Sequence, residues 1–344
     1  MGMIYSSLPE AVRVAEILQG LQKRYVAGLM ALVGEEPIST TWFRNEGECG
    51  GGERLSFLEN TALAGSSINF SQVHYQSNSD VRLAVATALS AIVHPAHPRL
   101  PSAHLHLSYT QMQDGDAHWR LMADLNPAIK NEQQQMKFDR ILAAVADQHL
   151  LEGVKNGNQY FYIPALERHR GVSHFYLERF ASGNFDDDLL YVEQFGMAVM
   201  TTYVSILMDG VEEGKEKDPS EKERASQLAY HTLYLFQVLL MDRGTTAGLL
   251  VHDQNDVGIL GSLPPRIDKN LLSSWGSRLT EPQDVLLNRL LGVMPQKGVV
   301  TITDSLKKQF AETIRRFYRE FPEGIYLQAK SPLNHQDRGL HGSP

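Results

Sequence analysis

Four histidines lie close together in this chain: His94, His97, His104 and His106. The first three stand in and at the exit of a loop punctuated by prolines, after which apolar and polar residues alternate from 103 to 109. Alternation with a period of two is typical of a strand with one buried face. The side chains of His104 and His106 therefore leave the same face of a rigid strand, where an imidazole can transfer protons or hold a ligand.

The residues from 116 to 125 alternate in the same way, after the segment Gln113–Asp114–Gly115. A three-residue hairpin loop with glycine in its last position is a common connection between strands, and here it pairs Met112 with Asp116. That register makes three facing pairs on one sheet face: His104 with Asp124, His106 with Met122, and Ser108 with Arg120. The sequence thus predicts a histidine–carboxylate pair with a guanidinium nearby. The alternative interpretation is a solvated sheet face with ordinary histidines.

The composition indicates an ordinary soluble globular protein, since 42% of the 344 residues are hydrophobic and 21% are charged. A net charge of -8 and a pI near 5.9 argue against a nucleic-acid-binding surface. Cys49 is the only cysteine, which excludes a disulfide framework and a thiolate metal site. The sequence shows no signal-peptide pattern and no apolar run of membrane-spanning length, so we expect a cytoplasmic protein.

The elements that must position these residues alternate between helices and strands, without a convincing linker or repeat. We expect a helix that opens with a capping box at Ser7–Glu10 and runs to Val33. Further helices are expected over 136–149, 186–208, 282–291 and 304–320, with another beginning at Asp218–Pro219. Strands are expected over 67–75, 160–164, 170–177, 234–241, 249–252 and 257–260, a solvated loop over 212–224, and a disordered tail over 331–344. The result is an α+β fold, a single domain over 1–330 with one large, mainly antiparallel β-sheet flanked by helical layers on both faces.

A series of short motifs resembles the oxygen-dependent coproporphyrinogen III oxidase family from about Trp42 to Met294. Each motif is weak alone, but their order and spacing together are specific. The motifs are Gly50–Gly52, Asn69–Ser71 with His74, Ser90–Pro95, Pro101–His104, Asp124–Leu125 with Pro127, Tyr160–Pro164, Arg170–Gly171, Asp242–Thr245 with Gly248–Leu249, and Ser262–Pro265.

The resemblance implies a homodimeric enzyme with a flat antiparallel sheet between two helical layers, and it places the family's dimer-forming region at Tyr234–Met241 with Asp242–Gly244. Such enzymes convert two propionates of a tetrapyrrole, a porphyrinogen, to vinyl groups by oxidative decarboxylation in heme biosynthesis. Molecular oxygen is the co-substrate, carbon dioxide and hydrogen peroxide are released, and no metal or organic cofactor is required. We accordingly expect no nucleic-acid partner and no membrane span.

The resemblance also assigns roles to single positions. His104 corresponds to the family's proposed acid/base histidine, Asp124 to the aspartate that contacts pyrrole nitrogens, and Arg170 to an active-site arginine. The chemistry suits these residue types, because a carboxylate stabilises developing positive charge, a histidine transfers protons, and an arginine binds a propionate. The expected substrate-binding residues are Ser90, His106, Ser108, Arg120 and Arg243.

Departures from the family pattern concern mainly the cations that would bind the substrate's four carboxylates. The family has an arginine at the position of Ser108 and glycines at Arg120–Met122. Because Arg120 faces Ser108 in the predicted hairpin, we expect the guanidinium to have moved to the partner strand. Other changed positions are His106, Ala165–Arg168, His231, Phe236, Val238 and Asn255–Gly258.

Three functions therefore remain open from the sequence. The first is an active coproporphyrinogen oxidase with an unusual propionate frame. The second is a diverged enzyme acting on another tetrapyrrole or electron-rich aromatic, and the third is a non-catalytic tetrapyrrole-binding protein on the same fold. A metal site using His94 and His104 is a less favoured alternative to the expected absence of metal. The helix at 304–320 lies beyond the resemblance, and its role is left open between capping the cleft, extending a dimer interface and docking a partner.

Overall fold

The structure is a computed structural model that describes residues 2–75, 81–214, 218–251, 255–296 and 298–329. Its middle layer is a seven-stranded antiparallel sheet in the order β1-β2-β3-β4-β5-β6-β9. The strands are β1 (Ile38–Phe43), β2 (Gly50–Ser56), β3 (Leu63–His74), β4 (Leu83–Pro95), β5 (Ser102–Met112), β6 (Ala117–Asn126) and β9 (Ser173–Phe180). Two small ribbons accompany it, β7 (Tyr162–Ile163) with β8 (Arg168–His169), and β10 (Arg266–Asp268) with β11 (Val299–Thr301).

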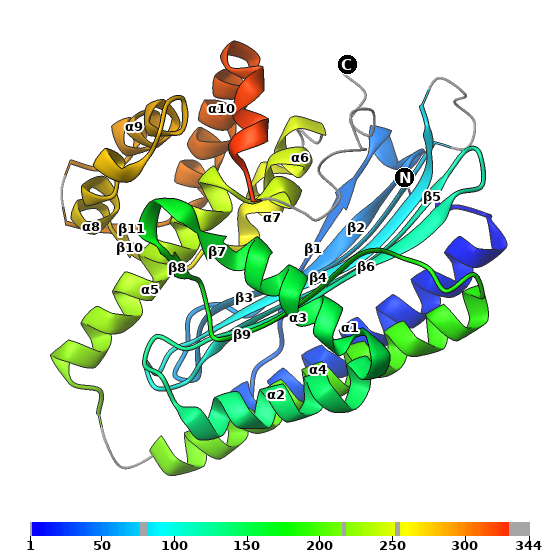
Figure 1. The fold of residues 1–344 in the computed structure, drawn as a ribbon, viewed down its shortest axis with the longest axis horizontal. Helices are drawn as coiled ribbons and strands as arrows, with labels where there is room; N and C mark the ends of the chain where they lie inside the picture. Colours follow the sequence, from blue (N-terminus) through cyan, green and yellow to red (C-terminus); the bar gives the residue numbers. More distant parts are fainter. Residues whose placement is uncertain (1, 76–80, 215–217, 252–254, 297, 330–344) are drawn as a thin grey trace.

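Helices cover both faces of this sheet, which confirms the predicted α+β architecture (Figure 1). The first helical layer contains α1 (Pro9–Val33), α2 (Glu132–Ala146) and α4 (Phe185–Gly214), and α3 (Leu150–Phe161) runs along β9. The second helical layer contains α5 (Glu221–Leu240), α6 (Arg243–Val251), α7 (Asp256–Ile259), α8 (Lys269–Ser274), α9 (Gln283–Val293) and α10 (Asp304–Glu320).

The two sheet faces differ because the strands alternate. Leu105, Leu107 and Tyr109 of β5 are buried in the core beneath the first helical layer. The residues between them face the second helical layer, which has its own apolar core. The sheet therefore separates two hydrophobic cores, and its polar residues lie on the side of the second layer.

The predicted strand at 234–241 is wrong, because this apolar run forms the last turns of α5 and its end. The helix opens with a capping box, in which Ser220 and Glu223 bond reciprocally, and continues to Leu240. Its final residues are buried between the sheet and the helices α8 and α9. A helix that is surrounded by protein is apolar all round, which hides the helical period. The dimer interface that we expected at a 234–241 strand accordingly loses its structural basis.

Several other expected elements need correction. Residues 249–251 and 256–259 belong to the short helices α6 and α7 rather than to strands, and residues 252–254 lie outside the described residues. Tyr160 and Phe161 end α3, so only two residues of that motif form a strand. His94 lies on β4 and not in a loop.

The boundaries of several helices also differ from expectation. The N-cap of α1 is Leu8, without a side-chain cap, so Ser7 and Glu10 form no capping box. The charged run from 212 is helical at both ends, and residues 215–217 between them are outside the description, as is the tail over 331–344. The helices expected at 186–208, 282–291 and 304–320 are confirmed as α4, α9 and α10.

The segment after residue 303 holds the short helices α6 and α7 in place. Arg315 of α10 donates from Nε to the Leu249 carbonyl oxygen at 2.7 Å and forms an ion pair with Asp256. Gln328 donates to Thr246 Oγ1 at 2.6 Å in a buried contact. These bonds tie α6 and α7 to α10 and to the residues that follow it.

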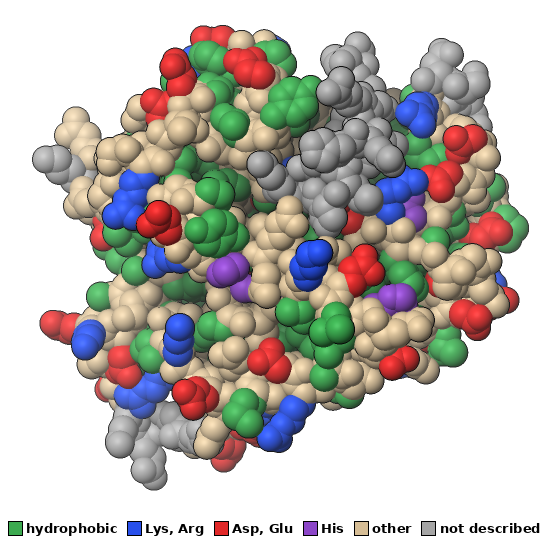
Figure 2. Space-filling view, in the orientation of Figure 1, with side chains coloured by type: hydrophobic (Ala, Val, Ile, Leu, Met, Phe, Trp, Pro, Cys, Tyr) green, Lys and Arg blue, Asp and Glu red, His purple; other side chains and the backbone are tan. Residues whose placement is uncertain are grey.

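The surface carries charges of both signs. On the face shown in Figure 2, basic and acidic side chains are interspersed rather than gathered into a patch of one sign. Within the described residues, no helix is long and apolar enough to cross a membrane.

Candidate active site

The β5–β6 hairpin has the register that the sequence predicts. The Met112 amide donates to the Asp116 carbonyl at 2.7 Å, and Gly115 has a φ of 91°, in the left-handed region. The three predicted facing pairs are confirmed: His104 with Asp124, His106 with Met122, and Ser108 with Arg120. Local turn chemistry is thus sufficient to place these side chains on one sheet face.

A cavity of about 420 Å³ lies between that face and the second helical layer. Its floor consists of alternate residues from four neighbouring strands, which span about 14 Å at the usual strand spacing. Most of the side chains near the middle of the floor are short, so little projects from the sheet into the cavity there. The floor residues are Ser67, Asn69, Ser71 and Val73 of β3, Ala86, Ala88, Ser90 and Ile92 of β4, His104, His106, Ser108 and Thr110 of β5, and Arg120 and Met122 of β6.

His104, Asp124 and Arg170 form one connected polar group. His104 Nδ1 donates to Asp124 Oδ1 at 2.9 Å, and Arg170 Nη2 donates to Asp124 Oδ2, also at 2.9 Å. Asn126 donates to the same Oδ2 at 2.5 Å. Burial alone would raise the pKa of Asp124, but Arg170 and the bonds from His104 and Asn126 lower this pKa to about 2. The carboxylate is therefore ionised. Because it engages Nδ1 of His104, the other ring nitrogen, Nε2, can face a substrate.

Asp124 itself does not reach the cavity, in contrast to the pyrrole contact that the resemblance implies. Its side chain is 0% exposed, and both oxygens are already bonded. His104 and Arg170, in contrast, both line the cavity. In this geometry Asp124 acts through its two partners, as a positioning residue beneath the floor.

Arg170 is fixed by aromatic rings as well as by Asp124. Its guanidinium carbon lies 4.8 Å from the ring centres of both Phe161 and Tyr234. The next residue, Gly171, has a φ of 82°, and a Cβ there would lie 2.7 Å from the Leu125 carbonyl oxygen. Glycine thus lets this loop approach β6 closely enough for Arg170 to reach Asp124. Arg170 Nε has no hydrogen-bond partner among the described residues.

Asp242 is the acidic side chain that lines the cavity, and our residue assignments missed it. Tyr160 donates its hydroxyl to Asp242 Oδ1 at 2.6 Å, and the Thr245 amide donates to Oδ2 at 2.7 Å. The sequence signal was the Asp242–Thr245 motif, from which only Arg243 was selected. Arg243 begins α6 and does not line the cavity, although it lies close enough to Tyr176 to influence that hydroxyl's pKa.

His106 lines the cavity in its neutral form. Burial, assisted by Arg120 and His104, lowers the pKa of His106 to about 3. Its Nε2 lies 3.0 Å from Ser108 Oγ. A histidine that stays neutral at physiological pH offers hydrogen bonds rather than proton transfer, which suits the expected binding role of His106 and Ser108.

Arg120 lines the cavity and also pairs with Glu178 of β9 at 3.0 Å. The Arg120 side chain is 39% exposed, whereas Glu178 is 9% exposed. Burial alone would lower the pKa of Arg120, but Tyr176 and Glu178 outweigh it and raise that pKa, so the guanidinium stays charged. Arg120 thus lies where the predicted transposition from position 108 requires it, and Ser90 lies on the floor as expected.

The histidines do not form a metal centre. Both ring nitrogens of His94 are engaged at 3.0 Å, Nδ1 by the Ser102 hydroxyl and Nε2 by the Ser262 carbonyl oxygen. Burial lowers the pKa of His94 to about 4, so this residue is a neutral, buried bridge between β4, β5 and the second helical layer. Among the described residues, no three His, Cys, Asp or Glu side chains are placed to hold a metal ion.

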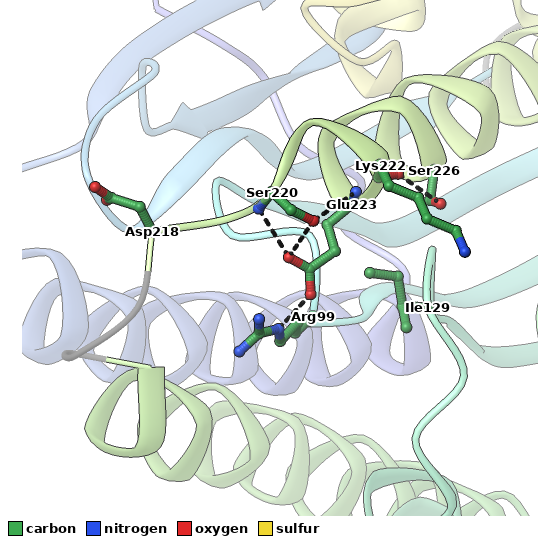
Figure 3. Close-up of a pocket in the computed structure, with 7 residues that line it drawn as sticks. All are labelled: Arg99, Ile129, Asp218, Ser220, Lys222, Glu223 and Ser226. Carbon is green, nitrogen blue, oxygen red and sulfur yellow. Dashed lines mark hydrogen bonds and ion pairs between the residues drawn. The ribbon is translucent and has the colours of Figure 1, made fainter.

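A separate surface hollow of about 670 Å³ lies at the start of α5 (Figure 3). Two of its charged groups bond to each other: Arg99 pairs with Glu223, which also accepts bonds from Ser220. These groups cap a helix, and we therefore place the candidate active site in the cavity over the sheet instead.

Residues 13–283 match the model of a family described as Coproporphyrinogen III oxidase. This match includes the sheet, the cavity floor and all of the site residues, and the chain therefore belongs to the coproporphyrinogen III oxidase family, whose members are oxidoreductases that use oxygen. The oxygen-dependent coproporphyrinogen-III oxidase of Rickettsia akari (strain Hartford) is 27% identical over 248 residues, which cover 68% of this chain and 85% of that protein. The family match begins earlier than the motifs suggested and ends before α10.

Proposed function

We propose that this chain catalyses the oxygen-dependent oxidative decarboxylation of coproporphyrinogen III, which converts two propionates to vinyl groups in heme biosynthesis. The observation that supports this most directly is a four-stranded floor of mostly short side chains that carries His104, with Arg170 and Asp242 lining the same cavity. A broad floor of short side chains suits a macrocycle, and the three polar groups suit its nitrogens, protons and carboxylates.

The reaction requires no group beyond the substrate, oxygen and a proton. For each propionate, the bond between the carboxylate and its side-chain carbon breaks and releases carbon dioxide. One hydrogen leaves the other side-chain carbon, which is attached to the pyrrole ring, so that a double bond forms between the two carbons. The two electrons released pass to dioxygen, which takes up that proton and one from solvent to form hydrogen peroxide. We therefore propose that no metal or organic cofactor takes part.

Each site residue has a role in this scheme. Asp242 accepts hydrogen bonds from pyrrole N–H groups and stabilises the positive charge that develops as the ring loses electrons. His104 takes up or returns a proton through Nε2, and Asp124 holds its ring in place through Nδ1. Arg170, Arg120, Ser90, His106 and Ser108 bind the substrate's polar edge.

One observation favours the second candidate, a diverged enzyme or a binding protein for another tetrapyrrole. Both arginines that line the cavity already have anionic partners, Arg170 in Asp124 and Arg120 in Glu178. A substrate with fewer carboxylates than coproporphyrinogen III would need fewer cationic partners in the cavity.

Turnover with and without oxygen tests the proposal. Purified protein is mixed with coproporphyrinogen III in air and under nitrogen, and products are followed by fluorescence chromatography and mass. We expect oxygen-dependent loss of two carbon dioxide molecules, and at least a hundredfold slower reaction for Asp242→Asn. The matched control is Asp114→Asn, at the exposed tip of the hairpin. Tight binding without turnover would support the binding protein instead.

The assembly is the one that the resemblance implies, and the location is the one expected from the sequence. We propose a homodimer with a two-fold interface in the cytoplasm. Light scattering of the purified protein at micromolar concentration should give twice the chain mass of 38.5 kDa. A monomer would contradict this part of the proposal and leave the catalytic part unaffected.

A further inference from the structure

A second hollow, of about 780 Å³, adjoins the cavity. It lies between the β1–β2 edge of the sheet, α7 and the start of α10. Trp42, Asn255 and Gly258 line both spaces, so the hollow is continuous with the cavity wall. The hollow depends on α10, which lies beyond the family match.

Arg54 of β2 lies on the cavity side of the sheet. In the strand register Arg54 faces Asn69, Asn69 faces Ser90, and Ser90 faces His106. Directly opposed residues of antiparallel strands leave the same sheet face, so Arg54 continues this row of floor residues into the hollow.

The Arg54 guanidinium reaches the boundary between the two spaces. A Cβ built on Gly261 would lie 3.3 Å from Arg54 Nη1 and 3.1 Å from Ser67 Oγ. Ser67 belongs to the cavity floor, so both polar groups approach the same point in the wall. A side chain at position 261 would crowd both groups.

The charges in the hollow are unevenly paired. Asp256, Asp304 and Glu312 line it, and each has a basic partner, respectively Arg315, Lys307 and Arg316. Arg54 and Lys308 also line it, but neither has an ion pair or side-chain hydrogen bond within the described part of the chain. Arg54 is partly buried, and burial lowers its pKa, opposed by the charge of Asp304. A cation in that position gains from an anionic partner.

We propose that Arg54 and Lys308 form a carboxylate-binding subsite that receives one propionate of a tetrapyrrole lying on the cavity floor. Arg54 is the inner, partly buried contact, and Lys308 is the outer, exposed one. This inference rests on the proposed function, since it assumes a substrate with several carboxylates. The subsite would supply positive charge to a substrate whose family partner at position 108, an arginine, is a serine in this chain.

The test measures binding of coproporphyrin III, the stable oxidised form of the substrate, by fluorescence titration. Arg54→Gln should weaken binding by at least tenfold, the effect of losing one charge-assisted hydrogen bond, which is about 1.4 kcal/mol. Lys308→Gln should weaken it by a smaller factor, and Arg54→Lys should restore part of the loss. Binding of the tetramethyl ester, which has no carboxylate, should stay unchanged in each variant.

Arg319→Gln is the matched control, since it removes an exposed cation from the same helix outside the hollow. It should leave both ligands' dissociation constants unchanged. Equal losses for coproporphyrin III and its ester would show a structural effect of Arg54 and overturn the subsite. Normal coproporphyrin III binding by Arg54→Gln and Lys308→Gln would also overturn it, while leaving the proposed function intact. Failure of the wild-type protein to bind either ligand would instead contradict the proposed function.

Discussion

Asp124 serves two functional side chains at once, His104 through one oxygen and Arg170 through the other. The histidine contact was predictable, because a local hairpin with a defined loop determines which residues face each other. The Arg170 contact was not, because Arg170 lies outside any regular strand and reaches β6 through a glycine loop. Asp242 was missed for the same reason: it approaches the sheet from the other layer, and no local pattern encodes that distance.

Replacing Asp124 by asparagine should cost both activity and stability. An amide cannot accept from both His104 Nδ1 and Arg170, and it leaves the buried Arg170 without its ion-pair partner. We expect the free energy of unfolding to fall by about 3–5 kcal/mol in urea denaturation. Turnover should fall more than a hundredfold even where the protein is folded. Normal rates at saturating substrate would remove the His104–Asp124 pair from the mechanism.

The exchange between positions 108 and 120 is testable in both directions. Arg120→Ala should weaken coproporphyrin III binding by about 1.5–3 kcal/mol, the range for a charge-assisted hydrogen bond. The double variant Ser108→Arg with Arg120→Gly restores the family pattern and should recover much of that binding in the same titration. If Arg120→Ala binds normally, the guanidinium serves only Glu178, and the transposition is wrong.

At the scale of elements, prediction succeeded where one face of a strand or helix meets solvent or a cavity. The hairpin, α1, α4 and α10 all show a clear period and were assigned correctly. The C-terminal part of α5 failed because it is buried on every side, and even Tyr234 and Val238, which line the cavity, are not polar enough to mark a period. Tyr234–Met241 is apolar at every position except Gln237 and matches a buried strand equally well. The predicted helix start at Asp218–Pro219, which the structure places two residues later at Ser220, was the better evidence. A helix that begins there needs a stop signal to end before Leu240, and residues 221–240 contain no glycine or proline.

The capping box should contribute measurably to α5. Ser220→Ala removes the bond that Ser220 Oγ accepts from the Glu223 amide at 3.3 Å. We expect the free energy of unfolding to fall by about 1 kcal/mol, the usual effect of losing an N-cap side chain. Ser226→Ala, six residues further along α5, removes a hydroxyl that bonds only to the Lys222 carbonyl oxygen of the same helix. It is the control and should change stability by less than half of this. Equal effects would mean that the cap does not limit the stability of α5.

The whole molecule contains several buried histidines whose neutral form is favoured by folding. Burial lowers the pKa of His94 and His174 to about 4 and that of His106 to about 3. The unfolded chain therefore binds more protons than the folded one below the ordinary histidine pKa of about 6.5. Their stabilising effect is complete above that pH and is lost as the pH falls from about 6.5 toward 4.

This difference gives a stability profile that urea denaturation can measure between pH 8 and pH 5. The free energy of unfolding should be level above pH 7 and then fall by up to roughly 1.4 kcal/mol per pH unit for each such histidine. His106→Asn, which removes one of these histidines and keeps a polar side chain, should make the fall less steep. An unchanged slope in that variant would show that His106 also titrates normally in the folded protein.

The bonds from Arg315 to Leu249 and from Gln328 to Thr246 also set an order of events during synthesis. A nascent chain that has emerged only to residue 283 already contains the sheet and every residue matched by the family. It still lacks the segment that ties down α6 and α7, and with it Lys308. The helices that cover the floor over β3 to β6 therefore gain these two tethers only after about forty-five further residues have been translated. The part of the chain that completes the cover is the last of the described residues to be made.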